Sequence, residues 1–207
     1  NNGKKNLFCF PPTISYCHIY YGFSQFMNEY NLFGINFISG QNAINKIVDE
    51  ILKIDQEEGP YNFIAYSAGG IFSTLVAEEL ERRGKIVENI ILIDCYWRKS
   101  IERNLKDNSK EELYKNLEDD GFISGATQVI KSIGLEKHTG KILNNAIDYL
   151  HFLHIEQKPV ANISADYHFI KSTDYPVTKD FIPWSNFTSG EYNEYNGFGG
   201  HNDMISS

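Results

Sequence analysis

Short, continuous apolar runs alternate along the chain with longer segments whose apolar residues recur at helical spacing. We interpret the runs as strands buried on both faces of a sheet, at residues 7–10, 32–38, 61–66 and 90–93. The segments between them predict helices at residues 20–27, 44–52 and 71–83. Because strands and helices alternate, the pattern predicts an α/β fold with a mostly parallel sheet flanked by helices.

The alternation is interrupted after Trp97. Residues 98–120 are dense in charge, and the segment from Ser109 to Glu112 has the spacing of a helix capping box. A longer helix, which Pro159 ends, then places apolar residues on one face: Ile142, Leu143, Ala146, Ile147, Leu150 and Leu153. A block of this size exceeds an ordinary connection. We therefore expect a helical lid at about 99–159, within one domain whose core is 1–98 and 160–207; the alternative is a plain surface subdomain.

Strands resume after this block, near residues 165–170 and 191–195. The second is followed by a glycine-rich segment, residues 197–201, that ends at His201. A sheet of this type normally carries a helix over its last strand. Because the sequence stops at Ser207, we expect that this C-terminal helix is missing from the chain.

Composition excludes several classes of protein. The chain has 207 residues with 42% hydrophobic and 14% aromatic content, so it can bury a core and is not disordered. Its 19 Lys and Arg against 27 Asp and Glu give a formal charge of −8, which offers nucleic acid no basic surface. No apolar run is long enough to span a membrane. An odd number of cysteines, Cys9, Cys17 and Cys95, favours reduced thiols and a cytoplasmic setting.

Candidate chemistry begins at Ser67, where the apolar run 61–66 ends and a helical pattern starts. A serine at a strand-to-helix turn sits on a sharp, strained backbone with its hydroxyl exposed above the sheet edge. The flanking positions must be small, and here they are Ala65 and Gly69, against the usual G-x-S-x-G. The alternative is a serine that only caps the following helix.

A serine nucleophile needs a base and a carboxylate, and in α/β-hydrolases these follow in the order Ser, Asp or Glu, His. Asp94 and His201 follow Ser67 in that order. Asp94 ends a strand, so its carboxylate would emerge at the same sheet edge as Ser67. Its rival is Asp174, and Asp94 could also be a turn residue. His201 could likewise be a loop residue without a role.

Two further elements complete the expected site. The oxyanion of an acyl-transfer intermediate needs two N–H donors. The first is Ala68, after the nucleophile, and the second is Thr13, because Pro11 and Pro12 have no N–H. His151 and His154 form H-x-x-H on the long helix, but no third ligand of suitable spacing accompanies them, so we predict no metal site.

Five motifs in order resemble one family: Leu7–Pro12, Gly59–Tyr61, Tyr66–Gly70, Ile93–Tyr96 and Gly197–His201. Together they resemble the C-terminal thioesterase domain of non-ribosomal peptide synthetases, most closely the lipopeptide type that makes surfactin or fengycin. The resemblance spans nearly the whole chain and is weakest across 99–160. It implies an α/β-hydrolase fold without the first strands of the full version.

The resemblance also implies a reaction. Ser67 would take a finished peptide or lipopeptide from the phosphopantetheine thiol of an upstream carrier domain, and the domain itself would bind no cofactor. An internal hydroxyl or amine would then give a macrocycle, or water a linear acid; we expect macrocyclisation. The resemblance favours Asp94 over Asp174 as the acid. Two alternatives stay open: a stand-alone editing thioesterase, although these tend to have G-H-S-x-G where this chain has Tyr66, and an inert binding module.

Overall fold

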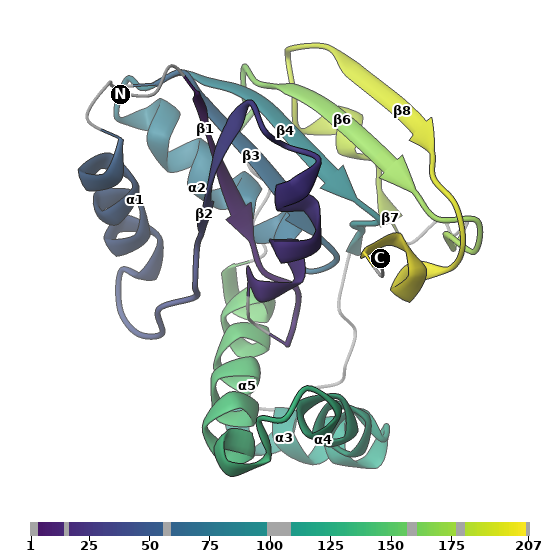
Figure 1. Ribbon diagram of the computed structural model, residues 1–207. Coiled ribbons are helices and arrows are strands. Elements are labelled where there is room, and N and C mark those ends of the chain that lie inside the picture. The colour runs from purple at the N-terminus through teal and green to yellow at the C-terminus, as the bar shows by residue number, and fades with distance from the viewer. Residues whose placement is uncertain are drawn as a thin grey trace.

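The computed structural model describes residues 4–14, 17–55, 59–98, 109–156, 161–176 and 181–205, and Figure 1 shows their arrangement. Within these residues the main sheet has the strand order β2-β1-β3-β4-β6-β8, and each neighbouring pair is parallel. Its strands are β1 (Lys5–Phe10), β2 (Tyr30–Gly34), β3 (Tyr61–Tyr66), β4 (Val87–Ile93), β6 (Asp166–Lys171) and β8 (Tyr192–Asn196). The predicted α/β fold is confirmed.

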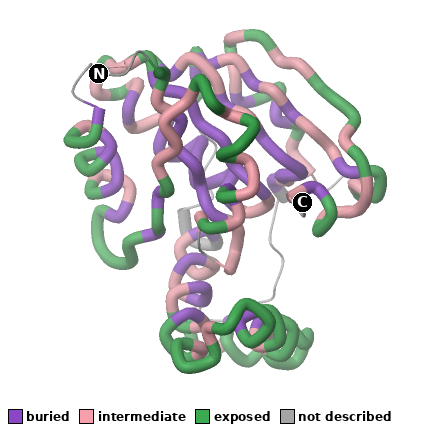
Figure 2. The backbone as a smooth tube through the Cα atoms, viewed as in Figure 1, coloured by how far each residue is buried: buried purple, intermediate pink, exposed green. Residues whose placement is uncertain are grey.

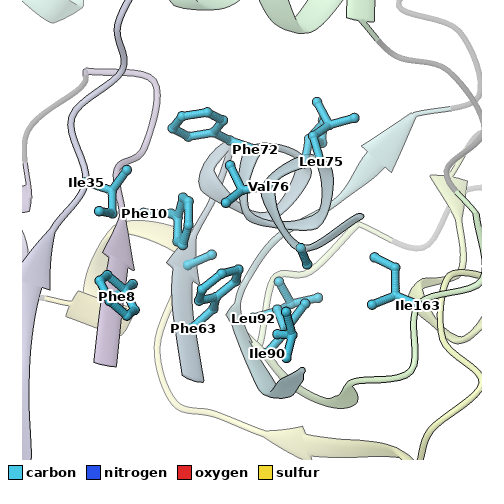
Figure 3. Close-up of a cluster of buried hydrophobic side chains, with 14 of the residues drawn as sticks. Phe8, Phe10, Ile35, Phe63, Phe72, Leu75, Val76, Ile90, Leu92 and Ile163 are labelled. Carbon is cyan, nitrogen blue, oxygen red and sulfur yellow. The ribbon is translucent and has the colours of Figure 1, made fainter. Parts of the chain in front are cut away.

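Helices α1 (Ala43–Ile54) and α2 (Gly69–Arg82) cover one face of the sheet. Figure 3 shows Phe72 and Val76 of α2 facing Phe10 and Phe63 of the central strands, and the rings of Phe10 and Phe72 meet edge to face at 5.4 Å. Figure 2 shows burial concentrated in this sheet and on the inner sides of its helices. Burial from both faces explains why β3 is buried at every position, as its apolar sequence predicts.

The other face of the sheet is covered by two short 3₁₀ helices, η1 (Cys17–Gln25) and η4 (His201–Ile205). The short helix predicted at 20–27 is therefore present as a 3₁₀ helix that begins and ends slightly earlier, at Cys17–Gln25. Tyr20 fixes this segment to the sheet, because its buried hydroxyl donates to the Phe10 carbonyl at 2.6 Å. This bond holds η1 over the carboxyl end of β1.

Strand β2 ends at Gly34, before the end of the predicted run 32–38. Its partner β1 ends at Phe10, and the prolines that follow have no N–H to continue the ladder. The last rung is the bond from the Ile35 N–H to the Cys9 carbonyl, at 2.9 Å. Ile35 and Phe37 then pack into the core from a non-strand segment.

The insertion after β4 forms α3 (Lys110–Asp119), α4 (Phe122–Ser132), η2 (Glu136–His138) and α5 (Thr139–Glu156). These helices lie beyond the carboxyl ends of the strands (Figure 1). Ser109 caps α3 as predicted, because its hydroxyl accepts from the Glu112 N–H at 3.1 Å. Helix α4 was not predicted. Residues 99–108 and 157–159 of the expected lid, including Pro159, lie outside the described residues.

Helix α5 joins the insertion to the body. Its Ile147 packs with Leu113 and Leu117 of α3, whereas Tyr149 and Leu153 belong to the main core. A small antiparallel pair is formed by β5 (Trp97–Arg98), which follows β4 in the chain, with β7 (Phe181–Ile182). The sequence did not predict this pair. A 3₁₀ turn, η3 (Trp184–Asn186), follows β7.

Candidate active site

Ser67 directly follows β3, and its backbone has a positive φ of 55°. This confirms the strained turn that the sequence predicted, because residues other than glycine rarely adopt this region. A side chain at position 69 would clash with the backbone, because a Cβ there would lie 2.7 Å from the Phe10 carbonyl oxygen. Ala65, at the position of the first glycine in the usual motif, is fully buried in the main core, which accommodates its methyl group.

Gly69→Ala is therefore expected to destabilise the fold by about 1–3 kcal/mol, the usual cost of overpacking a close contact. The matched control is Gly125→Ala in α4, where an added Cβ would meet nothing within 4 Å. That change replaces a glycine inside a helix and is expected to stabilise by up to about 1 kcal/mol. Urea unfolding of the two variants measures both effects. Equal urea midpoints for Gly69→Ala and the parent would show that the turn can accommodate a Cβ at position 69.

The structure brings Ser67, His201 and Asp94 together, although more than 100 residues separate His201 from each of its partners. The Nε2 atom of His201 lies 3.1 Å from the Ser67 hydroxyl oxygen. Its Nδ1 atom lies 2.5 Å from Oδ2 of Asp94. With the proton on Nδ1, His201 donates to Asp94 and accepts from Ser67, which is the arrangement that general-base activation of a serine requires.

Asp94 is only 1% exposed and is held at a positive φ of 45°. Its second oxygen accepts from the Ser172 N–H at 2.8 Å, so both carboxylate oxygens are engaged. Burial alone would raise the pKa of Asp94, but the hydrogen bonds from His201 and Ser172 outweigh it, and the net pKa is lowered. Asp94 is therefore ionised at neutral pH, as the partner of an imidazolium must be.

Asp174, the rival acid, lies nearby but makes a different contact. Its Oδ1 accepts from the Ser172 hydroxyl at 2.8 Å. In the described part of the chain, the carboxylate hydrogen-bonded to His201 is that of Asp94. The geometry therefore favours Asp94. The Asp174 carboxylate lies beside Gly200, the residue before His201, but its hydrogen bond is to Ser172.

Tyr66 is a contact of His201 that the sequence analysis missed. Its hydroxyl donates to the His201 backbone carbonyl at 2.8 Å, and its ring stacks on the imidazole at 4.9 Å between centroids. Burial raises the pKa of Tyr66 well above its ordinary value, so the hydroxyl remains a donor. The sequence feature that could have identified Tyr66 was its place at the end of β3, one residue before Ser67 and on the opposite face of the strand from Ala65.

A cavity of about 350 Å³ opens beside Ser67 and His201. The insertion supplies an apolar wall to it, consisting of Phe122, Val129, Ile130, Ile133 and Ile142. Ile142 belongs to the apolar face that the sequence predicts for the long helix. Ile147 and Leu150 of the same predicted face instead pack within the insertion, against residues of α3 and α4.

The expected oxyanion donors lie on the two segments that border Ser67. Thr13 lines the same cavity as Ser67. Ala68 directly follows Ser67 and occupies the N-cap position of α2, with φ −61° and ψ −21°. The structure therefore places Ala68 directly after the serine and Thr13 on the wall of the cavity that Ser67 lines.

The other candidate side chains give little support to a cysteine nucleophile or a metal site. Cys95 is buried beneath the serine turn, and burial raises its pKa well above the ordinary value, so it is a poor nucleophile. His, Cys, Asp and Glu side chains form no group of three or more suited to a metal within the described ranges, and the side chain of His154 is outside that set. The helices seen in those ranges are all too short or too polar to cross a membrane.

A mostly parallel sheet, a strained serine after a central strand and a late histidine bound to a carboxylate define the α/β-hydrolase class. The thioesterase domain profile matches residues 5–188, and the chain belongs to this family. This confirms the resemblance inferred from the five motifs.

Individual relatives agree with this assignment. Bacitracin synthase 3 of Bacillus licheniformis is 36% identical over 213 residues, covering 99% of this chain but 3% of that protein. Surfactin synthase subunit 3 of Bacillus subtilis (strain 168) is 26% identical over 204 residues, covering 96% of this chain and 15% of that protein. The chain thus spans a small part of both relatives.

A solved structure shows the same fold. The thioesterase domain SrfTE, described in connection with the cyclization of the lipopeptide antibiotic surfactin, matches with a TM-score of 0.79 at 24% identity. The match covers 100% of this chain and 86% of that one. At this identity the likeness concerns the architecture, which is the α/β-hydrolase fold.

Proposed function

We propose that this domain takes a peptidyl chain from the phosphopantetheine thioester of a neighbouring carrier domain onto Ser67 and then releases it. The observation that carries the proposal is the hydrogen-bonded series Ser67–His201–Asp94, of which Ser67 and His201 line a largely apolar cavity. The series activates a hydroxyl, and the cavity can bind the apolar part of an acyl group. Family membership supports a thioester as the bond that is broken.

The geometry of the site supports the following acylation step. The Ser67 oxygen attacks the thioester carbonyl while Nε2 of His201 takes its proton, and Asp94 stabilises the imidazolium. The N–H groups of Ala68 and Thr13 bind the oxyanion of the tetrahedral intermediate. His201 then returns the proton to the departing thiolate, and the acyl group remains as an ester on Ser67.

Resolution of that ester repeats the chemistry with another nucleophile. His201 deprotonates a hydroxyl or amine of the same peptide, or a water molecule, which attacks the ester carbonyl. The bond to the Ser67 oxygen then breaks, and His201 gives its proton to that oxygen, which restores the serine. We propose that residues 99–155 act as a lid, because α4 and Ile142 wall the cavity with apolar side chains. An apolar cover keeps bulk water from the ester and favours the tethered end of the peptide. Macrocyclisation is the outcome we propose.

Mass analysis of the products tests this outcome. With a full-length peptidyl thioester, the parent domain is expected to release mainly a cyclic product, which is one water lighter than the linear acid. Ile130→Asp places a charge in the apolar wall and is expected to shift products toward the linear acid, because it admits water. The control is Val87→Ala in β4, a buried site that does not line the cavity. If the parent releases only the linear acid, macrocyclisation is contradicted and the domain is a hydrolase.

Two other functions predict different results. An editing thioesterase would prefer short, misloaded acyl groups on carrier domains to a finished peptide. An inert binding module would leave Ser67 unmodified by a fluorophosphonate, which reacts with activated serines. Tyr66 before the serine, where the editing enzymes tend to have histidine, favours the terminal, peptide-releasing type.

A further inference from the structure

A buried tyrosine of the insertion reaches the junction of the two segments that border Ser67. Tyr149 of α5 is fully buried, and its hydroxyl lies 3.2 Å from the Pro11 carbonyl oxygen and 3.4 Å from that of Ala68. Pro11 belongs to the segment after β1, and Ala68 to the turn after β3. One side chain from a third element therefore contacts both segments.

These two segments already touch each other. A Cβ on Gly69 would lie 2.8 Å from the Pro11 carbonyl oxygen, so the serine turn and the segment after β1 are in close backbone contact. The Tyr149 hydroxyl is placed beside that contact and bridges the carbonyls on its two sides. A shift of either segment would lengthen one of the two bonds.

The bridged carbonyls are adjacent to the proposed oxyanion donors. Pro12 separates the Pro11 carbonyl from the Thr13 N–H, and its ring fixes φ, so ψ of Pro12 is the one soft dihedral angle between the two peptide planes. At the other segment, the carbonyl and the proposed donor N–H belong to the same residue, Ala68. The hydroxyl therefore constrains both halves of the proposed oxyanion hole.

We propose that Tyr149 is a positioning residue that holds the Ala68 and Thr13 donors at the separation the oxyanion requires. This inference rests on the proposed function, and it deepens it by tying the hole to the lid helix. The Tyr149 ring is fixed by Phe37 at 5.0 Å and Phe72 at 5.4 Å between centroids. Because α5 also supplies Ile142 to the cavity wall, one helix supports both the wall and the hole.

The hydroxyl is suited to this role in its protonated form. Burial raises the pKa of Tyr149 well above its ordinary value, so the group remains a donor at neutral pH. Its one proton is shared by two carbonyls, and the shorter distance is to Pro11. The bond thus acts mainly on the segment that carries Thr13.

Tyr149→Phe removes the hydroxyl and keeps the ring, and Tyr167→Phe is the matched control. Tyr167 is also fully buried, but its hydroxyl contacts Thr74 of α2, away from both segments. With a fatty-acyl thioester of N-acetylcysteamine, Tyr149→Phe is expected to lower kcat at least tenfold with little change in KM. Loss of a direct oxyanion donor lowers kcat by about 10²–10³-fold, and this sets the upper limit for a residue that acts by positioning the donor. The control is expected to keep the parent's kcat.

Infrared spectroscopy of the acyl-enzyme separates positioning from a purely structural role. With an isotope label in the acyl carbonyl, weaker oxyanion bonds raise the carbonyl stretching frequency. We expect this rise in Tyr149→Phe and not in Tyr167→Phe, with both variants retaining the parent's circular dichroism. An acylated parent whose kcat and carbonyl frequency are reproduced by Tyr149→Phe would overturn the positioning role alone. A parent that forms no acyl-enzyme at Ser67 would overturn this inference together with the proposed function.

Discussion

Ser67→Ala is expected to abolish acyl release, with a loss on the order of 10⁶-fold, as for removal of the nucleophile in other serine enzymes. The hydroxyl oxygen is the atom that receives the acyl group, and it lies 3.1 Å from Nε2 of His201. No other described side chain is placed to replace it. Release from a peptidyl thioester mimic, followed by free-thiol detection, measures the loss.

The matched control for this variant is Ser73→Ala. Ser73 lies on α2, and its buried hydroxyl donates to the Gly70 carbonyl at 3.0 Å, away from His201. It is expected to retain the parent's rate, with a stability cost of about 1 kcal/mol for the lost hydrogen bond. Turnover by Ser67→Ala within tenfold of the parent would remove Ser67 as the nucleophile.

Asp94→Asn is expected to lower kcat by about 10⁴-fold, the loss known for the corresponding change in a well-studied triad. The amide would present an N–H or a neutral oxygen to Nδ1 of His201, where the parent has a carboxylate at 2.5 Å. The imidazole would then lose its correct tautomer and its charge partner. Steady-state kinetics with the same thioester measures the effect.

Asp174→Asn is the matched comparison, because it makes the same chemical change on the next strand's end. Asp174 contacts Ser172 and has only this indirect connection to Asp94. We expect its kcat to fall less than tenfold. A larger loss for Asp174→Asn than for Asp94→Asn would assign the acid to the later strand.

The parallel sheet was predictable because its central strands are buried on both faces. Such strands are nearly continuous apolar runs, and β3 extends from Tyr61 to Tyr66, as the sequence indicates. The end of β2 depended on its partner, since β1 ends just before two prolines. The pair β5 and β7 could not be foreseen, because each strand has two residues and carries no periodicity.

The three residues of the candidate site were predictable because each stands at a recognisable break in the pattern. Ser67 and Asp94 end apolar strands, and His201 follows a glycine-rich segment. Tyr149 carries no such signal, since its role depends on contacts with residues 11 and 68, far away in the sequence. The apolar wall of the cavity was predictable only in part. The helical pattern shows which residues form a buried face, but it does not show whether the cavity or another helix buries each of them.

We propose that Ser67 carries the peptide as an ester. The most direct test mixes the domain with a peptidyl thioester, quenches it with acid and maps the protein's peptides by mass spectrometry. We expect the mass of the acyl group on the peptide that contains Ser67, and none on the Ser67→Ala variant. An acyl group on another residue, or turnover by the parent with no covalent adduct at any quench time, would contradict it.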